Sequence, residues 1–66
     1  MFRNLKAEMI RQNVSIKDIA NLLNIKVGTA RAKINGKIGV SLEDCKKITT
    51  LFNENNTIDY LFKKAD

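Results

Sequence analysis

The chain has no histidine, no proline and no tryptophan, and it has a single cysteine in 66 residues. Because Cys45 is alone, it cannot form an internal disulfide, and without histidine it cannot contribute to a Cys/His zinc site. The same absences remove the imidazole and the nucleophile–base pairs on which many enzymes depend. Composition therefore argues against an enzyme, and we expect no metal, no cofactor and no small-molecule substrate.

Long apolar runs are missing as well. No stretch of 18 apolar residues could span a bilayer, and no charged segment leads into an apolar stretch and a small-residue cleavage site, as in a secretory signal. We expect a cytoplasmic protein with no membrane partner. A chain of 66 residues makes one domain, over 1–66, with a small hydrophobic core.

Acidic residues are absent from positions 19–42, which carry four cations, and the whole chain has a net charge of +5. Unbalanced cations repel one another in the free protein and gain free energy when they displace counterions from phosphates. Nucleic acid is therefore the favoured partner. A membrane surface, or a basic face with no functional meaning, stays possible from charge alone.

Hydrophobic spacing predicts five helices and no strand. Their expected limits are about 2–12, from Ser15 to Asn24, 27–34, from Ser41 to about Phe52, and a short helix around 58–62. The first helix has an apolar face (Phe2, Leu5, Met9, Ile10) and a polar face (Arg3, Lys6, Glu8, Arg11). The apolar stripe of the fourth comprises Leu42, Cys45, Ile48, Thr49 and Phe52.

Helix ends are marked by polar residues and glycine. Ser15 to Asp18 and Ser41 to Asp44 both fit a capping box, in which a serine oxygen and an acid three residues later satisfy backbone N–H groups. Asn24 is suited to a left-handed turn, and Gly36 to a C-terminal cap of the third helix.

The second and third helices, with the short turn between them, fit a helix-turn-helix. The pattern requires apolar residues at Ile19, Leu23, Ile25 and Ala30, and the small Ala20 allows a close approach. The third helix is built from small side chains and cations, so its backbone can enter the major groove of DNA while the cations reach phosphate. Gly28 has two explanations: room against the second helix, or backbone access to DNA.

The segment SIKDIANLLNIKVGTARAKINGK, residues 15–37, resembles the helix-turn-helix core of the lambda-repressor-like (XRE/Cro/CI) regulators. Residues 35–62 are similar to the fourth and fifth helices of small phage-type members. The most specific features are the Ile19-Ala20 pair, the core positions Ile25 and Ala30, and Asn35-Gly36-Lys37. The resemblance implies an all-α, five-helix domain that binds operator DNA as a homodimer, usually at an inverted repeat, and regulates transcription as repressors and Cro-like proteins do.

The resemblance also assigns roles. It implies that the residues facing base edges are Val27, Gly28, Arg31 and Ala32. The cations beside them and residues at two helix ends would contact phosphate. The full predicted DNA-binding set is Ser15, Lys17, Lys26, Val27, Gly28, Thr29, Arg31, Ala32, Lys33, Asn35 and Lys37. Arg31 is the preferred base reader, because a guanidinium can bond guanine O6 and N7 together; the alternatives are a phosphate contact or a charge that only keeps the protein soluble.

Three positions depart from the family pattern. Ile16 and Val27 stand where many members have glutamine, so the pair of glutamines that grips a base and a phosphate is missing; Val27 could contact a thymine methyl instead. Lys33 occupies a position that is commonly apolar, and Ile34 follows it, so the core contact is expected to shift by one residue.

Other uses of the chain stay open. The main alternative is a protein-interaction module on the same fold, of the antitoxin or antirepressor type, because fold alone does not decide function. Cys45 is expected to be a buried structural thiol rather than a redox sensor. Phe52 and Leu61 are assigned to the core, and a last set is divided between core and dimer face: Tyr60, Phe62 and Leu51.

Overall fold

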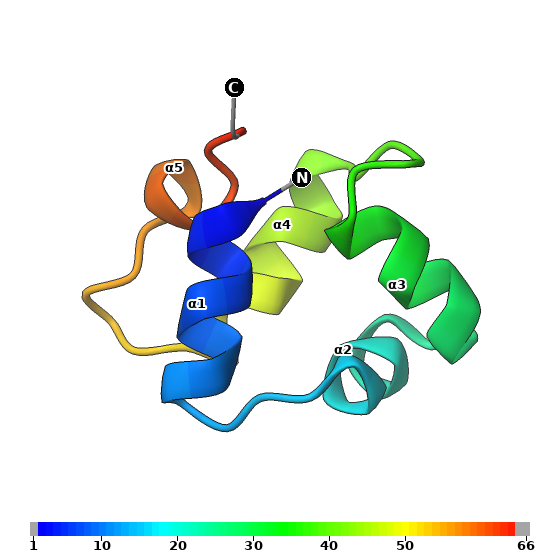
Figure 1. Cartoon of the computed structure of the whole chain (residues 1–66), viewed down its shortest axis with the longest axis horizontal. Helices are drawn as coiled ribbons and strands as arrows, with labels where there is room; N and C mark the ends of the chain where they lie inside the picture. Colours follow the sequence, from blue (N-terminus) through cyan, green and yellow to red (C-terminus); the bar gives the residue numbers. More distant parts are fainter. Residues whose placement is uncertain (1, 65–66) are drawn as a thin grey trace.

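Five α-helices form the described part of the chain, residues 2–64, in a computed structural model of the protein (Figure 1). They are α1 (Arg3–Arg11), α2 (Ile16–Leu23), α3 (Val27–Ile34), α4 (Leu42–Thr49) and α5 (Ile58–Leu61). No strand occurs between residues 2 and 64. The radius of gyration is 10.5 Å, close to the value of about 11 Å expected for a compact chain of this length. The all-α fold class is therefore confirmed.

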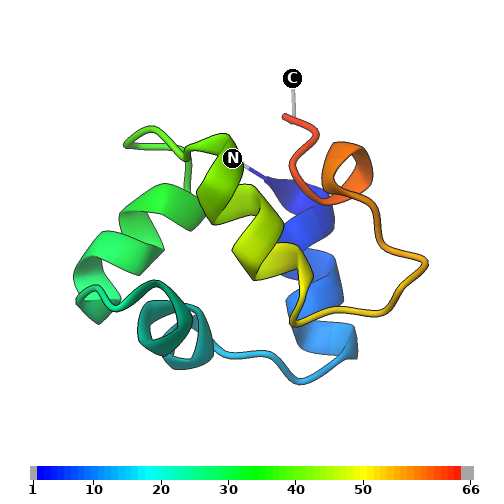
Figure 2. The same ribbon diagram turned by 180° about the vertical axis from the view of Figure 1, so that it is seen from behind.

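The helices pack around α4 and α2. α2 lies against both α3 and α4, α5 lies against α4 and α1, and α4 crosses the middle of the molecule when it is seen from behind (Figure 2). The two ends of the described chain meet on one side, where the rings of Phe2 and Phe62 pack edge to face with centroids 5.2 Å apart. None of the helices within residues 2–64 is long and apolar enough to cross a membrane.

Three helices end in the same way, on a residue with positive φ: Asn13 at 56°, Asn24 at 56° and Gly36 at 78°. In each case the N–H of the next residue bonds the carbonyl five residues earlier, as from Ile25 to Ala20 at 3.0 Å and from Lys37 to Ala32 at 2.9 Å. This Schellman arrangement satisfies carbonyls that the helix itself leaves unbonded. The predicted roles of Asn24 and Gly36 are confirmed.

The two expected capping boxes differ. At α2 the box is complete, because the Ser15 hydroxyl accepts the Asp18 N–H at 3.1 Å and the Asp18 carboxylate accepts the Ser15 N–H at 2.9 Å. At α4 the Ser41 hydroxyl accepts the Asp44 N–H at 3.1 Å, but the Asp44 carboxylate binds the Lys33 ammonium. The second acid thus joins α4 to α3.

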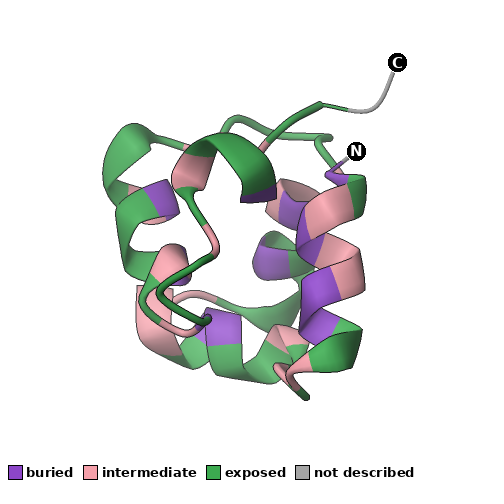
Figure 3. Ribbon diagram, turned by 90° about the vertical axis from the view of Figure 1, so that its left-hand side faces the viewer, coloured by how far each residue is buried: buried purple, intermediate pink, exposed green. Residues whose placement is uncertain are grey.

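The core lies where the helices face one another, as the buried positions in Figure 3 show. Its largest fully buried side chains are Leu5, Ile19, Ile48 and Leu61. The expected burial of Cys45, Phe52 and Leu61 is confirmed, while Leu51 and Phe62 are half-buried and Tyr60 is exposed. Ala20 and Ala30 are buried as well, which brings α2 and α3 close together.

Two predictions for α1 are wrong. Ile10, assigned to the apolar face, is 83% exposed, because the buried stripe of α1 follows Phe2, Leu5 and Met9 and Ile10 projects to one side of it. Glu8, assigned to the polar face, is only 7% exposed. Its burial is compensated by hydrogen bonds, so polarity alone does not place it outside.

Glu8 is the centre of a polar network that joins α1 to the C-terminal part of the chain. Its carboxylate accepts hydrogen bonds from the Arg11 guanidinium, from Gln12 Nε2 at 2.9 Å and from the Tyr60 hydroxyl at 3.0 Å. Gln12 also bonds Asn56 Oδ1 at 2.6 Å and accepts the N–H of Asn53 at 2.9 Å. The Gln12 hydrogen bond is the main cause that lowers the pKa of Glu8, so the network contains an ionised acid.

Two predictions for α4 are also wrong. Leu42 is 63% exposed instead of lying on the buried stripe, because the core begins one turn later, at Cys45. The helix ends at Thr49 instead of near Phe52. From Thr50 to Phe52 each N–H bonds the carbonyl three residues back, so the chain tightens into a turn that still buries Phe52.

Candidate nucleic-acid interface

The outer face of α3 is accessible along most of its length. Two residues, Ala30 and Ile34, are buried and hold the helix against the core. Val27 is 41% exposed, and Gly28, Thr29 and Arg31 are exposed as well. α3 therefore shows solvent a surface made mainly of backbone and short side chains, with a guanidinium in the middle.

Gly28 does not serve packing against α2. A Cβ added at this position would meet no heavy atom of the protein within 4 Å. Its backbone φ is not in the positive range, so another residue would adopt the same helical conformation without strain. Of the two explanations for this glycine, room against the second helix is therefore excluded.

Four of the predicted cations point to solvent. Lys17, Lys26, Arg31 and Lys37 are all exposed, and within residues 2–64 none of them forms an ion pair. Free cations on an accessible face leave the local positive potential uncompensated, which favours an anionic ligand.

Lys33 lies elsewhere. Its ammonium bonds the Asp44 carboxylate at 3.1 Å and the Gly39 carbonyl at 3.2 Å, and its side chain is only 17% exposed. The Lys33 bond holds the pKa of Asp44 below its usual value. Ile34 takes the core contact in place of Lys33, so the expected shift by one residue is confirmed. The structure thus joins Lys33 to α4 and does not add it to the cations on the exposed face.

The remaining predicted residues lie at the helix ends. The Ser15 hydroxyl is exposed and uses its oxygen as a cap acceptor, so its own proton can still be donated to a ligand. Asp18 accepts the N–H of Ser15, which lowers the pKa of Asp18 and keeps an ionised acid beside Lys17. Asn35 and Ala32 are half-buried.

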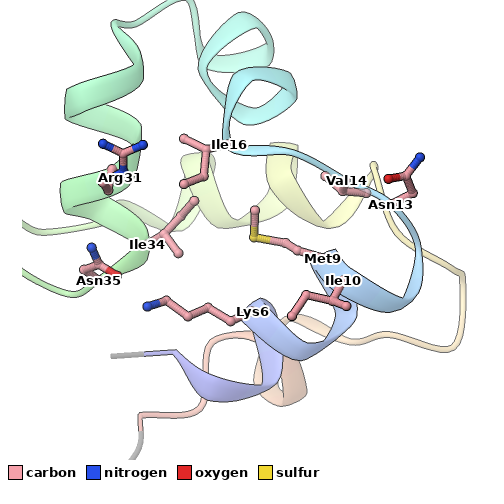
Figure 4. A pocket seen from close by; sticks show the side chains of 9 residues that line it. All are labelled: Lys6, Met9, Ile10, Asn13, Val14, Ile16, Arg31, Ile34 and Asn35. Carbon is pink, nitrogen blue, oxygen red and sulfur yellow. The ribbon is translucent and has the colours of Figure 1, made fainter.

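A cavity of about 570 Å³, which we name the α1–α3 pocket, lies beside Arg31 (Figure 4). It is lined by Lys6, Met9, Ile10, Asn13, Val14, Ile16, Arg31, Ile34 and Asn35. The pocket brings Arg31 and Asn35 together with Lys6 from α1, whose amine extends towards α3. The sequence does not predict that Lys6 lies near Arg31, because it shows Lys6 only as one cation of a polar helix face and gives no sign that this face lies near α3.

Among residues 2–64, no three His, Cys, Asp or Glu side chains lie together as a possible metal site. Cys45 is buried, and burial raises the pKa of its thiol, so the thiol is protonated at neutral pH and unreactive.

Comparison of this chain with known protein families, with curated proteins and with solved structures gives no match.

Proposed function

We propose that this protein is a sequence-specific, double-stranded DNA-binding regulator of the lambda-repressor-like type, in which α2 and α3 form the helix-turn-helix. The observation that carries the proposal is the outer face of α3, which is exposed, free of acids and narrow at Gly28. A groove lined by phosphates attracts cations and has no room for large side chains. The outer face of α3 carries a cation and has mainly small side chains, so it matches such a groove.

The dimensions of α3 support insertion into the major groove. A helix is about 10–12 Å wide with its side chains, and the major groove of B-DNA is about 12 Å wide, so short side chains are needed for a close approach. The exposed residues of α3 include a glycine and a threonine, and Ala32 is half-buried. Arg31 is then the longest side chain that can reach base edges from the centre of the helix.

The proposed binding is tested by selecting bound sequences from a random DNA pool. An enriched inverted repeat is expected, with half-sites about 34 Å apart if two copies bind as a homodimer. Binding should also be sensitive to salt. If the four exposed cations all meet phosphate, the logarithm of the binding constant should fall with the logarithm of salt concentration with a slope of about 3 to 4 for each copy.

Arg31→Ala and Lys37→Ala separate base reading from phosphate contact. Arg31→Ala should weaken binding to the selected sequence about 5- to 150-fold, equivalent to about 1–3 kcal/mol, and weaken binding to random DNA much less. Lys37→Ala should weaken binding to both DNAs alike and reduce the salt slope by about one. Both side chains are exposed, so neither change should disturb folding.

Two results would contradict these assignments. Equal losses on selected and random DNA would make Arg31 a phosphate contact. If no salt-sensitive DNA binding is found with the folded protein, the helix-turn-helix proposal fails, and a protein-interaction module becomes the better explanation.

A further inference from the structure

The α1–α3 pocket has features that DNA binding does not require. Its wall is largely apolar: Met9, Ile10, Ile16 and Ile34 line it, and Ile10 is the exposed one, whereas Met9 and Ile34 are buried. Ile10 is 83% exposed in the free protein, although a large aliphatic side chain gains free energy when it is covered. Phosphates do not cover apolar surface, so a different ligand is needed to explain this wall.

The shape of the pocket favours a small molecule. Its side chains come from α3 on one side, from α1 on the other, and from the α1–α2 connection and the start of α2 (Figure 4), and the space between them opens to solvent. Its volume of about 570 Å³ lies within the range of about 300–1,000 Å³ typical of small-molecule sites, which are mostly apolar with a few polar groups.

Charge identifies the chemical class. Lys6 and Arg31 line the pocket, and no acidic side chain of the described residues does. A second copy of this chain is a poor occupant, because it carries the same net charge of +5 and would bring like charges together. A ligand with an apolar body and one anionic group fits both the wall and the cations.

We propose that the α1–α3 pocket binds a small amphipathic carboxylate, with its apolar body against Ile10 and its carboxylate on the side of the pocket that Arg31 and Lys6 line. Because Arg31 is also the proposed base reader, the same ligand would compete with DNA. The competition with DNA rests on the proposed function, whereas the binding of the carboxylate in the pocket does not.

Decanoate is a suitable probe, used below its micelle-forming concentration. The expected result is a saturable change in the NMR signals of the Met9, Ile10 and Ile34 methyl groups. Two matched probes separate the contributions: acetate has the charge without the apolar body, and decyltrimethylammonium has the body with the opposite charge. An equal response to acetate would show simple anion binding, and an equal response to decyltrimethylammonium would show nonspecific apolar contact. Either result would overturn the proposal. The absence of any response to decanoate would overturn it as well.

Ile10→Gln is the matching variant. It should weaken decanoate binding at least tenfold and leave DNA affinity unchanged. Leu42→Gln is the control, because it replaces an exposed aliphatic side chain of the same size outside the pocket, and it should leave both affinities unchanged. Equal decanoate affinity in the wild-type chain and Ile10→Gln would overturn the site.

Competition is measured with selected DNA. With decanoate at ten times its dissociation constant, the apparent dissociation constant for DNA should rise about tenfold. Decanoate binding without any DNA binding would overturn the proposed function and leave the pocket assignment in place. DNA binding that decanoate does not weaken would overturn the competition.

Discussion

Replacing Gly28 with alanine should raise the stability of the protein and weaken its binding to DNA. The added Cβ meets nothing within 4 Å, so no packing penalty opposes the better helix propensity of alanine. In a helix interior this preference is worth about 1 kcal/mol, and Gly28 is the second residue of α3, where we expect about half of it. The melting temperature should then rise by about 2–4 °C.

The same methyl group would stand on the surface that we propose to face the bases. Holding the helix backbone away from the DNA should cost at least one base contact, which corresponds to about tenfold in affinity for the selected sequence. Thermal unfolding followed by circular dichroism measures the first effect, and a mobility-shift titration measures the second. Gly39→Ala is the control, since its Cβ also meets nothing within 4 Å and Gly39 is not a predicted DNA contact.

Either half of this prediction can fail by itself. Lower stability in Gly28→Ala would mean that the space beside residue 28 is occupied. Higher stability with undiminished DNA affinity would mean that the glycine is not needed for close approach, and the main support for placing α3 in the groove would be lost.

Two further predictions concern stability. Leu61→Ala should lower the unfolding free energy by about 2–5 kcal/mol out of a total of about 3–10 kcal/mol, because Leu61 is fully buried. The exposed Leu42 is the control, and Leu42→Ala should change the unfolding free energy by less than about 0.5 kcal/mol. Equal effects of the two substitutions in urea titrations would show that α5 is not part of the core. Glu8 and Asp44 have lowered pKa values in the folded chain, so their stabilising effect is present at neutral pH and should be lost on acidification below about pH 4.5. Glu8→Gln should reduce this loss of stability in acid. An unchanged dependence of the unfolding free energy on pH in Glu8→Gln would contradict the prediction.

Local signals in the sequence were sufficient for much of the fold. The bounds of α3 agree with the spacing from Val27 to Ile34, and the caps at Ser15, Asn24 and Gly36 formed as expected, because each depends on backbone geometry within a few residues. These elements are specified by neighbours in the chain.

The wrong predictions concern positions whose burial depends on residues far away in the sequence. Glu8 is buried because Tyr60, far away in sequence, supplies a hydrogen bond, and helical periodicity does not contain that information. Ile10 is exposed because no element covers its side of α1. The α1–α3 pocket could not be predicted for the same reason, since it depends on how Lys6 and Arg31 are brought together by packing.

The bond from Lys33 to Asp44 gives α4 an influence on α3. The last turn of α3 is held by an acid that precedes the buried part of α4, and the Gly39 carbonyl holds the same ammonium. The tilt of α3 is therefore set partly by residues outside it. If α3 binds DNA as we propose, substitutions at position 44 would change the orientation of Arg31 relative to the duplex, although Asp44 itself is not among the proposed contacts.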